Sequence, residues 1–238
     1  MEGKQKSAPP RSAASYRYLT LVTGLFVTCL IVSNIITVKI VSFGGVIMSA
    51  AIVIFPLSYI FGDILTEVYG YARSRQIIWI GFLCNALAVL AMQAGAWLPA
   101  ADFWEGQAAY EQILGYAPRL LLASLVAYLC GEFVNSFVLA KMKILTQGKW
   151  LWTRTVSSTL FGQGIDTVIF TLVAFTGVLT ADAMINITVT EWILKCLYEI
   201  VATPVTYAVV NFLKRTEHED YYDYKTDFNP FHGLAEAK

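Results

Sequence analysis

The sequence predicts an all-α, polytopic membrane protein with six transmembrane helices. Of its 238 residues, 57% are hydrophobic and only 14% are charged, a composition typical of membrane proteins. Apolar runs close to the length of about 20 residues that crosses a bilayer recur along the chain. Lys and Arg gather in alternate connecting segments, as they do in multi-pass proteins. The zero net charge gives no reason to expect a nucleic-acid partner.

The chain divides into a leading segment, a membrane domain and a tail. Residues 1–16 are basic and rich in Ser, Ala and Pro, which predicts a disordered lead-in. Residues 17–213 hold the apolar runs and form the six-helix transmembrane domain. Residues 214–238 form a polar, tyrosine-rich tail. The six spans are expected at about residues 17–39, 46–68, 76–98, 118–142, 156–179 and 187–212.

The positive charges predict the orientation of the bundle. Fourteen of the seventeen Lys and Arg residues lie in the two tails and in the second and fourth connecting segments with their margins. Only Lys39 and Arg119 fall on the opposite side, and Lys195 lies within the sixth span. Because cytoplasmic segments carry the excess of Lys and Arg, both termini are expected in the cytoplasm.

A short internal echo suggests two related halves. Phe61-Gly62-Asp63 in the second span resembles residues 161–166 (FGQGID) in the fifth span. Two three-helix halves with inverted topology, a 3+3 repeat, are a common plan in transporters. A coincidence between two apolar helices explains the echo as well, and both interpretations stay open.

The second span carries the two acids around which the sequence is organised. Asp63 and Glu67 are one helical turn apart and therefore share a face. An acid at the centre of a spanning helix costs about 2.5–3.5 kcal/mol on insertion scales. Such residues usually meet a partner, a cavity or a substrate. Glu67 is nearer the cytoplasmic end of the span and is expected to face water.

The other spans carry further polar residues at helical spacing. The ordinary explanation is that these residues bond between helices. Asn34 would then bond to a polar group on another span, and Lys195 would pair with Glu191 or Glu199. One embedded base cannot neutralise all of the embedded acids, and unpaired acids favour a polar cavity. The candidate site residues are Asn34, Asp63, Glu132, Asn135, Gln163, Asp166, Lys195 and Glu199.

A cavity lined by carboxylates and amides suits a planar ligand with adjacent N–H donors. The edge of a guanine-like base is one such ligand. The aromatic candidates for stacking on its ring are Phe55, Tyr59, Phe61, Tyr128, Phe133, Phe161, Phe170 and Tyr198. An amine would also gain from the surplus of acids. The residues alone leave a base, an amine and a vitamin open. The four cysteines lie in apolar segments without metal-ligand spacing, and both histidines lie in the tail, so neither a metal nor a cofactor is expected.

Several of these residues stand in motifs of a known family. Ser33-Asn34, the run from Pro56 through Asp63 to Gly70, Ser158 to Thr167, Lys195 with Pro204, and the tail at residues 222–231 together resemble the queuosine precursor transporter family, also called the VUT family. The resemblance extends over residues 17–232. It implies a bacterial inner-membrane importer of 7-deazaguanine bases such as 7-cyano-7-deazaguanine and 7-aminomethyl-7-deazaguanine, which are precursors of queuosine in tRNA.

The resemblance also implies roles for the candidate residues. Asp63 and Asp166 would be the principal ligands of the base, and Asn34 and Gln163 would support them. Glu132 and Asn135 would belong to the same site. Lys195 and Glu199 would form a charge pair that changes as the transporter alternates. The expected partners are the small-molecule base and the lipid bilayer, with no nucleic acid; a homodimer is left open.

Two alternatives remain, a variant of the transporter and a protein of another class. The chain could be the substrate-binding membrane subunit of a vitamin or nucleobase uptake system that borrows an ATPase. It could also be an intramembrane aspartyl enzyme, since Asp63 and Asp166 superficially resemble two acids that share a proton. However, the segment 162–166 has one residue too many before its acid, and no G-x-S-x-G motif is present. A transporter is therefore predicted rather than an enzyme.

Overall fold

The computed structural model describes residues 16–43, 46–115 and 118–232. These residues form seven α-helices, one 3₁₀ helix (η2, Ala50–Val53) and two short strands. Six of the helical segments are long and apolar enough to cross a membrane, as the sequence predicts. The helices are α1 Leu19–Ile36, α2 Phe55–Tyr69, α3 Tyr71–Trp97, α4 Gln107–Leu114, α5 Pro118–Leu145, α6 Leu151–Phe175 and α7 Ala181–Glu217.

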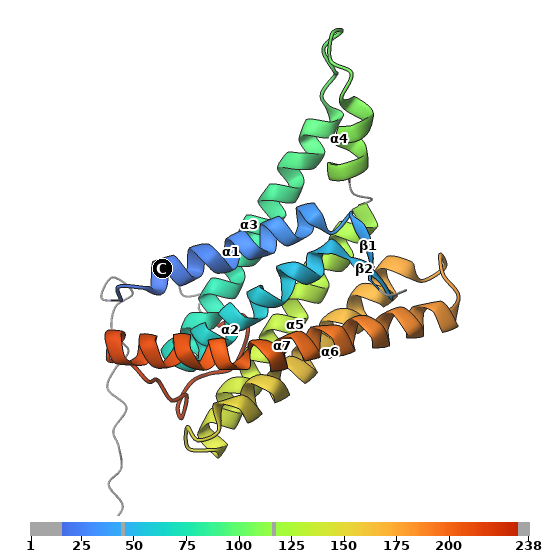
Figure 1. Cartoon of the computed structure of the whole chain (residues 1–238). Coiled ribbons are helices and arrows are strands. Elements are labelled where there is room, and N and C mark those ends of the chain that lie inside the picture. Colours follow the sequence, from blue (N-terminus) through green and yellow to red (C-terminus); the bar gives the residue numbers. More distant parts are fainter. Residues whose placement is uncertain (1–15, 44–45, 116–117, 233–238) are drawn as a thin grey trace, which may run out of the picture.

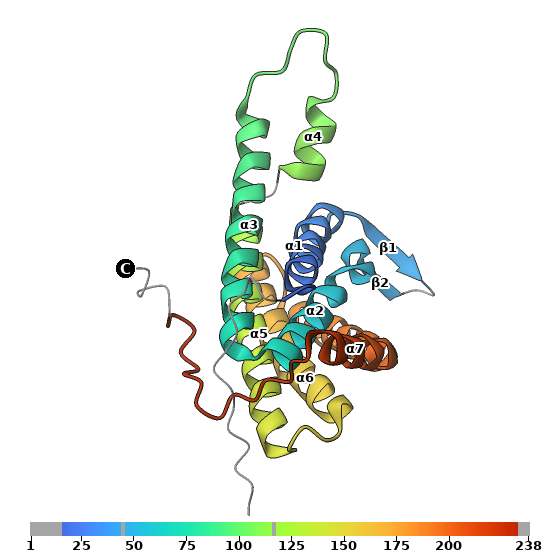
Figure 2. The same cartoon turned by 90° about the vertical axis from the view of Figure 1, so that its left-hand side faces the viewer.

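The helices form one bundle with α3 at its edge. α1, α2, α5, α6 and α7 lie alongside one another, and α3 extends beyond them (Figure 1). Figure 2 shows α4 beside the far end of α3, where the Tyr110 hydroxyl donates to the Met92 carbonyl at 3.1 Å. On α3, Leu83, Leu87 and Leu90 are each more than 60% exposed. Their spacing of three to four residues puts them on one face, which suits contact with lipid.

A β-hairpin corrects the all-α prediction. β1 (Ile40–Phe43) pairs antiparallel with β2 (Val46–Ser49), so the second span does not begin at residue 46 as expected. Both strands are rich in β-branched residues, which favour strands. The helical part of the second span begins only after Ser49, whose hydroxyl accepts from the Ala51 N–H at 3.1 Å. Pro56, in the first turn of α2, is placed where a helix tolerates it.

The turn between the second and third spans is shorter than the sequence suggests. α2 and α3 are separated by Gly70 alone, whose φ of 83° suits glycine. Arg73 and Arg75 were expected in a connecting loop, but they lie in the first turns of α3. The Arg75 guanidinium is buried and donates to the carbonyls of Asp227 and Asn229. A basic side chain at this position therefore serves to anchor the tail.

The segment after α7 packs against the bundle. Asp223 is buried, and its carboxylate accepts from the Tyr71 N–H at 3.1 Å. The Tyr221 N–H donates to the Val68 carbonyl at 3.2 Å, and the Trp79 indole donates to the Pro230 carbonyl. The predicted lead-in, residues 1–16, lies outside the described residues except for its last member. The tail therefore covers the end of the bundle at which α2 meets α3.

The ion pairs of Asp220 predict a pH-dependent contribution to this packing. Burial alone would raise the pKa of Asp220, but contacts with Lys143 at 2.6 Å and Lys214 at 2.8 Å outweigh it and hold the pKa below its usual value. A lowered pKa stabilises the fold above the usual value of about 3.9 and loses that effect as the pH falls through the lowered one. We expect Asp220→Asn to weaken protection of the tail from hydrogen exchange at pH 7 and to make no difference well below pH 4.

Asp223 changes the pH dependence of the tail packing in the opposite direction, so the parent protein has to be compared with the Asp220→Asn variant. Burial raises the pKa of Asp223 despite the hydrogen bonds from Thr226 and from the Tyr71 N–H. A raised pKa gives a contribution that is present at low pH and lost as the pH rises. Only the difference in hydrogen-exchange protection between parent and Asp220→Asn isolates the contribution of Asp220. An equal difference at both pH values would contradict it.

Close packing of α5 and α6 depends on two glycines. A Cβ added at Gly162 would lie 2.6 Å from the Asn135 Cβ and 2.9 Å from the Gly131 carbonyl oxygen. Overpacking of this kind typically costs about 1–3 kcal/mol. We expect Gly162→Val to lower the melting temperature of the purified protein markedly. Gly24→Val is the matched control, since nothing lies within 4 Å of a Cβ at that exposed position. An equal effect of the two changes would contradict the close packing.

Candidate substrate-binding site

A pocket lies where the hairpin and the start of the second span meet the ends of the other helices. α1, β2, η2, α2, α5, α6 and α7 all contribute to it. Its volume of about 110 Å³ is several times the space that one buried water molecule requires. The lining residues are Ser33, Asn34, Thr37, Met48, Ser49, Ala51, Ile52, Phe55, Ser124, Asp166, Phe170, Glu191, Leu194 and Lys195.

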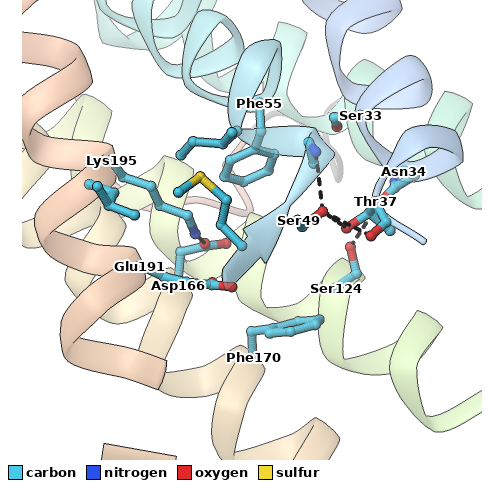
Figure 3. A pocket seen from close by; sticks show the side chains of 14 residues that line it. Ser33, Asn34, Thr37, Ser49, Phe55, Ser124, Asp166, Phe170, Glu191 and Lys195 are labelled. Carbon is cyan, nitrogen blue, oxygen red and sulfur yellow. Dashed lines mark hydrogen bonds and ion pairs between the residues drawn. The ribbon is translucent and has the colours of Figure 1, made fainter. Parts of the chain in front are cut away.

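One side of the pocket carries charge. The Lys195 ammonium of α7 contacts the Asp166 carboxylate of α6 at 3.0 Å and the Thr167 hydroxyl at 3.2 Å. Glu191, one turn before Lys195, also lines this side, as Figure 3 shows. The Lys195 nitrogen lies 4.7 Å from the centre of the Phe55 ring, within range of a cation–π contact. This side thus offers both a cation and carboxylates.

The other side of the pocket is polar and neutral. The Asn34 amide donates to the Asn85 side-chain oxygen at 2.6 Å, and its own oxygen accepts from the Ser124 hydroxyl at 3.2 Å. Thr37 and Ser49 exchange a hydrogen bond at 3.1 Å. Figure 3 shows these groups across the pocket from Lys195. Asn34 therefore bonds between helices, as the ordinary explanation predicts, and lines the pocket as well.

The structure brings together three of the predicted site residues at this pocket: Asn34, Asp166 and Lys195. Lys195 pairs with Asp166 on the neighbouring helix. The prediction that Lys195 pairs with Glu191 or Glu199, four residues away on its own helix, is therefore wrong. Both oxygens of Glu199 lack a hydrogen-bond partner among the described residues. The reason is the packing of α6 against α7, which presents an acid on the neighbouring helix at closer range.

The remaining predicted residues do not line this pocket. Asp63, Glu132, Asn135, Gln163 and Glu199 are all at most 1% exposed and lie within the bundle. The Asn135 amide donates to the Asp63 carboxylate at 2.7 Å, which joins α5 to α2. The sequence therefore identified two groups of polar residues and treated them as one site.

Among the acids considered from the sequence, Glu67 has the environment that differs most from the expected one. It does not face water, but is completely buried. The Arg154 guanidinium donates to both of its oxygens at 2.7 Å, and the Lys214 ammonium approaches at 2.6 Å. Lys143 lies 3.7 Å away and also bonds to Asp220. Three bases that the sequence assigned to cytoplasmic segments thus converge on this acid, and they hold together α2, α5, α6 and α7.

Sequence reasoning missed several of the residues that line the pocket, among them Met48, Ser49 and Ser124. Ser49 and Ser124 are single serines within apolar runs, and Met48 belongs to the hairpin that the sequence did not reveal. A lone serine in a spanning segment carries no signal of its own. The aromatic residues Phe55 and Phe170 were foreseen as candidates for stacking, and both line the pocket.

Comparison with known proteins identifies the family. The chain matches a family model described as "Putative vitamin uptake transporter" over residues 49–209, more than half of its length. It is 30% identical over 198 residues to the "Probable queuosine precursor transporter" of Bacillus subtilis (strain 168), and the alignment covers 82% of this chain and 86% of the relative. The chain belongs to the queuosine precursor transporter (VUT) family. No solved structure matches this VUT-family member.

A second relative extends the comparison. This VUT-family member is 24% identical over 159 residues to the "Queuosine precursor transporter" of Escherichia coli (strain K12), covering 66% of this chain and 69% of the relative. The family model includes every predicted site residue except Asn34. Since the relatives are named transporters, the chain is a multi-pass membrane protein of a transporter family, and the alternative of an intramembrane enzyme finds no support.

Proposed function

We propose that this VUT-family member imports 7-deazaguanine precursors of queuosine across the bacterial inner membrane by alternating access. The cargo would be a base such as 7-cyano-7-deazaguanine or 7-aminomethyl-7-deazaguanine. The observation that supports this most is the pocket in which an Asp–Lys pair, a neutral amide and two aromatic rings meet. The names of the two relatives point to the same class of cargo.

The chemistry of the pocket matches the edge of a guanine-like base. Such a base presents adjacent N–H donors, which the Asp166 carboxylate would accept, and a carbonyl, which Lys195 would donate to. Phe55 and Phe170 would contact the faces of the ring. Lys195 already neutralises Asp166 at 3.0 Å, so binding exchanges one set of polar contacts of this carboxylate for another.

The second element of the proposal is the direction. With both termini in the cytoplasm, as the distribution of Lys and Arg favours, the pocket lies in the half of the bundle that faces away from the cytoplasm, near the end of α1 and the start of α7. The buried Glu67 network lies at the opposite end, near the last turn of α2. The described conformation would then be the one that receives the base from outside. Asp63, Glu132, Asn135, Gln163 and Glu199 would form the inner part of the transport path.

The test is uptake in cells that depend on it. In a bacterial strain that neither makes nor imports the precursors, this chain should restore queuosine in tRNA when a 7-deazaguanine is supplied outside. Asp166→Asn should abolish the restoration. Asp102→Asn, the same change at an exposed position in the connector before α4, should not. A parent protein that reaches the membrane in full amount and restores nothing would overturn the proposed cargo.

A further inference from the structure

Three buried carboxyl groups lie in the interior of the bundle, apart from the pocket. They are Asp63 of α2, Glu132 of α5 and Glu199 of α7, and none is more than 1% exposed. Glu132 packs against Gly62, the neighbour of Asp63, and Glu132 and Glu199 both lie close enough to Asp63 for the charges to repel one another. We call them the inner acid cluster. Its members come from three helices that would have to move relative to one another in alternating access.

The inner acid cluster is largely without hydrogen-bond partners. One oxygen of Asp63 accepts from the Asn135 amide at 2.7 Å, whereas its other oxygen has no partner among the described residues. The same holds for both oxygens of Glu132 and both oxygens of Glu199. Nearly all buried polar atoms in proteins are satisfied. Five unsatisfied carboxyl oxygens in one region therefore require an explanation.

Three other polar groups in the interior of the bundle have unused hydrogen-bonding capacity. The Gln163 side-chain oxygen, the Asn135 side-chain oxygen and the Tyr59 hydroxyl are also buried and unpartnered in the described part of the chain. A carboxylate accepts hydrogen bonds but donates none, so it offers nothing to the two amide oxygens. A protonated carboxyl group has an O–H to donate. Unpartnered acceptors in the same part of the bundle therefore favour a donor there, which a protonated carboxyl group supplies and a carboxylate does not.

No base of the described residues neutralises the cluster. Further acids act on two of its members, namely Glu67 on Asp63 and Asp166 on Glu132. Lys195 is bound to Asp166, and Arg154, Lys143 and Lys214 are bound around Glu67. The other titratable neighbours are uncharged when protonated: Tyr59, Tyr128, Cys130 and Cys196.

Elementary electrostatics then decides the state of the cluster. An unpaired carboxylate buried away from bulk water costs several kcal/mol, and three of them close together repel one another in addition. A proton removes this cost without requiring space. A metal ion would require several converging ligands, and the described residues contain no group of three or more acidic, His or Cys side chains placed to hold one. Glu132 also packs directly against Gly62, where an added Cβ would overlap its carboxyl group.

We propose that Asp63, Glu132 and Glu199 form a proton-binding site, distinct from the substrate pocket, that couples uptake to inward proton movement. The coupling rests on the function proposed above. Protons occupy the cluster in the described conformation. They leave when α2 and α7 separate at the Glu67 network, because cytoplasmic water then solvates the carboxylates, which favours the charged form. The free energy of the proton gradient thereby drives accumulation of the base.

One arm of the test needs no substrate. Infrared spectra of the purified protein at neutral pH should show the carbonyl band of protonated carboxyl groups. The band should weaken in each of the variants Asp63→Asn, Glu132→Gln and Glu199→Gln, and it should persist in Asp102→Asn. Size-exclusion chromatography verifies that each variant is folded. If folded parent protein shows no such band, or if the three variants leave it unchanged, the proton site is overturned.

The other arm measures coupling in liposomes that contain the full-length protein and a pH-sensitive dye. Addition of 7-cyano-7-deazaguanine outside should acidify the interior, and a proton gradient should concentrate the base. Folded variants of the inner acid cluster should lose both effects, whereas Asp102→Asn, outside the cluster and the pocket, should keep both. Accumulation driven by sodium without proton entry would overturn the coupling. A parent that neither binds nor exchanges any deazaguanine would instead overturn the proposed cargo, while the infrared arm still decides the proton site.

Discussion

Replacing Glu67 by Gln is expected to lower the stability of the protein more than any other single acid-to-amide change. Glu67 is completely buried and receives the Arg154 guanidinium on both oxygens at 2.7 Å, with Lys214 at 2.6 Å. Removing one partner of a buried ion pair costs about 3–5 kcal/mol, because the other charges stay buried without compensation. For a protein of this size that corresponds to roughly 6–20 °C in melting temperature.

The measurement is the melting temperature of detergent-purified protein. Glu105→Gln, the same change at an exposed position, is the control and should shift it by little. The double variant Glu67→Gln/Arg154→Gln should be less destabilised than the sum of the two single variants, since it removes charges of both signs. Additive effects, or a shift for Glu67→Gln as small as for the control, would contradict a network that holds the helices together.

Among substitutions of a single basic residue, Lys195→Met is expected to weaken substrate binding most. Lys195 lines the pocket and contacts Asp166 at 3.0 Å. The change removes the proposed donor to the base and leaves the Asp166 carboxylate without its cation. Hydrogen bonds to charged groups contribute about 1.5–3 kcal/mol, which corresponds to an affinity about 10- to 150-fold weaker.

Titration calorimetry with 7-cyano-7-deazaguanine measures this effect, with Lys225→Met as the matched change at an exposed position of the tail. Asp166→Asn and Lys195→Met should each raise the dissociation constant by some factor. The double variant should raise it by no more than the product of these two factors, because the two side chains act as one pair. Binding by folded Lys195→Met protein that equals the parent's would contradict the placement of the base in this pocket.

The membrane architecture was predictable from the sequence because it follows from local composition. Apolar runs of sufficient length give the six spans whatever their partners are. The hairpin at Ile40–Phe43 and Val46–Ser49 was not predicted, since a short apolar run fits a strand and a helix equally well. The packing of the tail through Asp223 and Arg75 depends on contacts more than 100 residues apart, which local patterns do not contain.

The candidate site was likewise predictable only in part. Helical spacing identified the embedded polar residues, including Asn34, Asp166 and Lys195, which line the pocket. Spacing along one helix could not reveal that Lys195 pairs across to α6, or that three bases from different segments converge on Glu67. Partner choice between helices is a property of their packing. The separation of the predicted residues into a pocket and an inner acid cluster appeared only with the fold.

The most direct test of the central claim, that the pocket holds a 7-deazaguanine base, is thermal stabilisation of the purified protein. The panel contains 7-cyano-7-deazaguanine, 7-aminomethyl-7-deazaguanine, queuine, guanine, thiamine and riboflavin. A ligand that binds only the folded state raises the melting temperature as its concentration rises. We predict such a rise with a 7-deazaguanine, and its loss in folded Asp166→Asn protein. A rise with thiamine or riboflavin alone, or an undiminished rise in the variant, would contradict the claim.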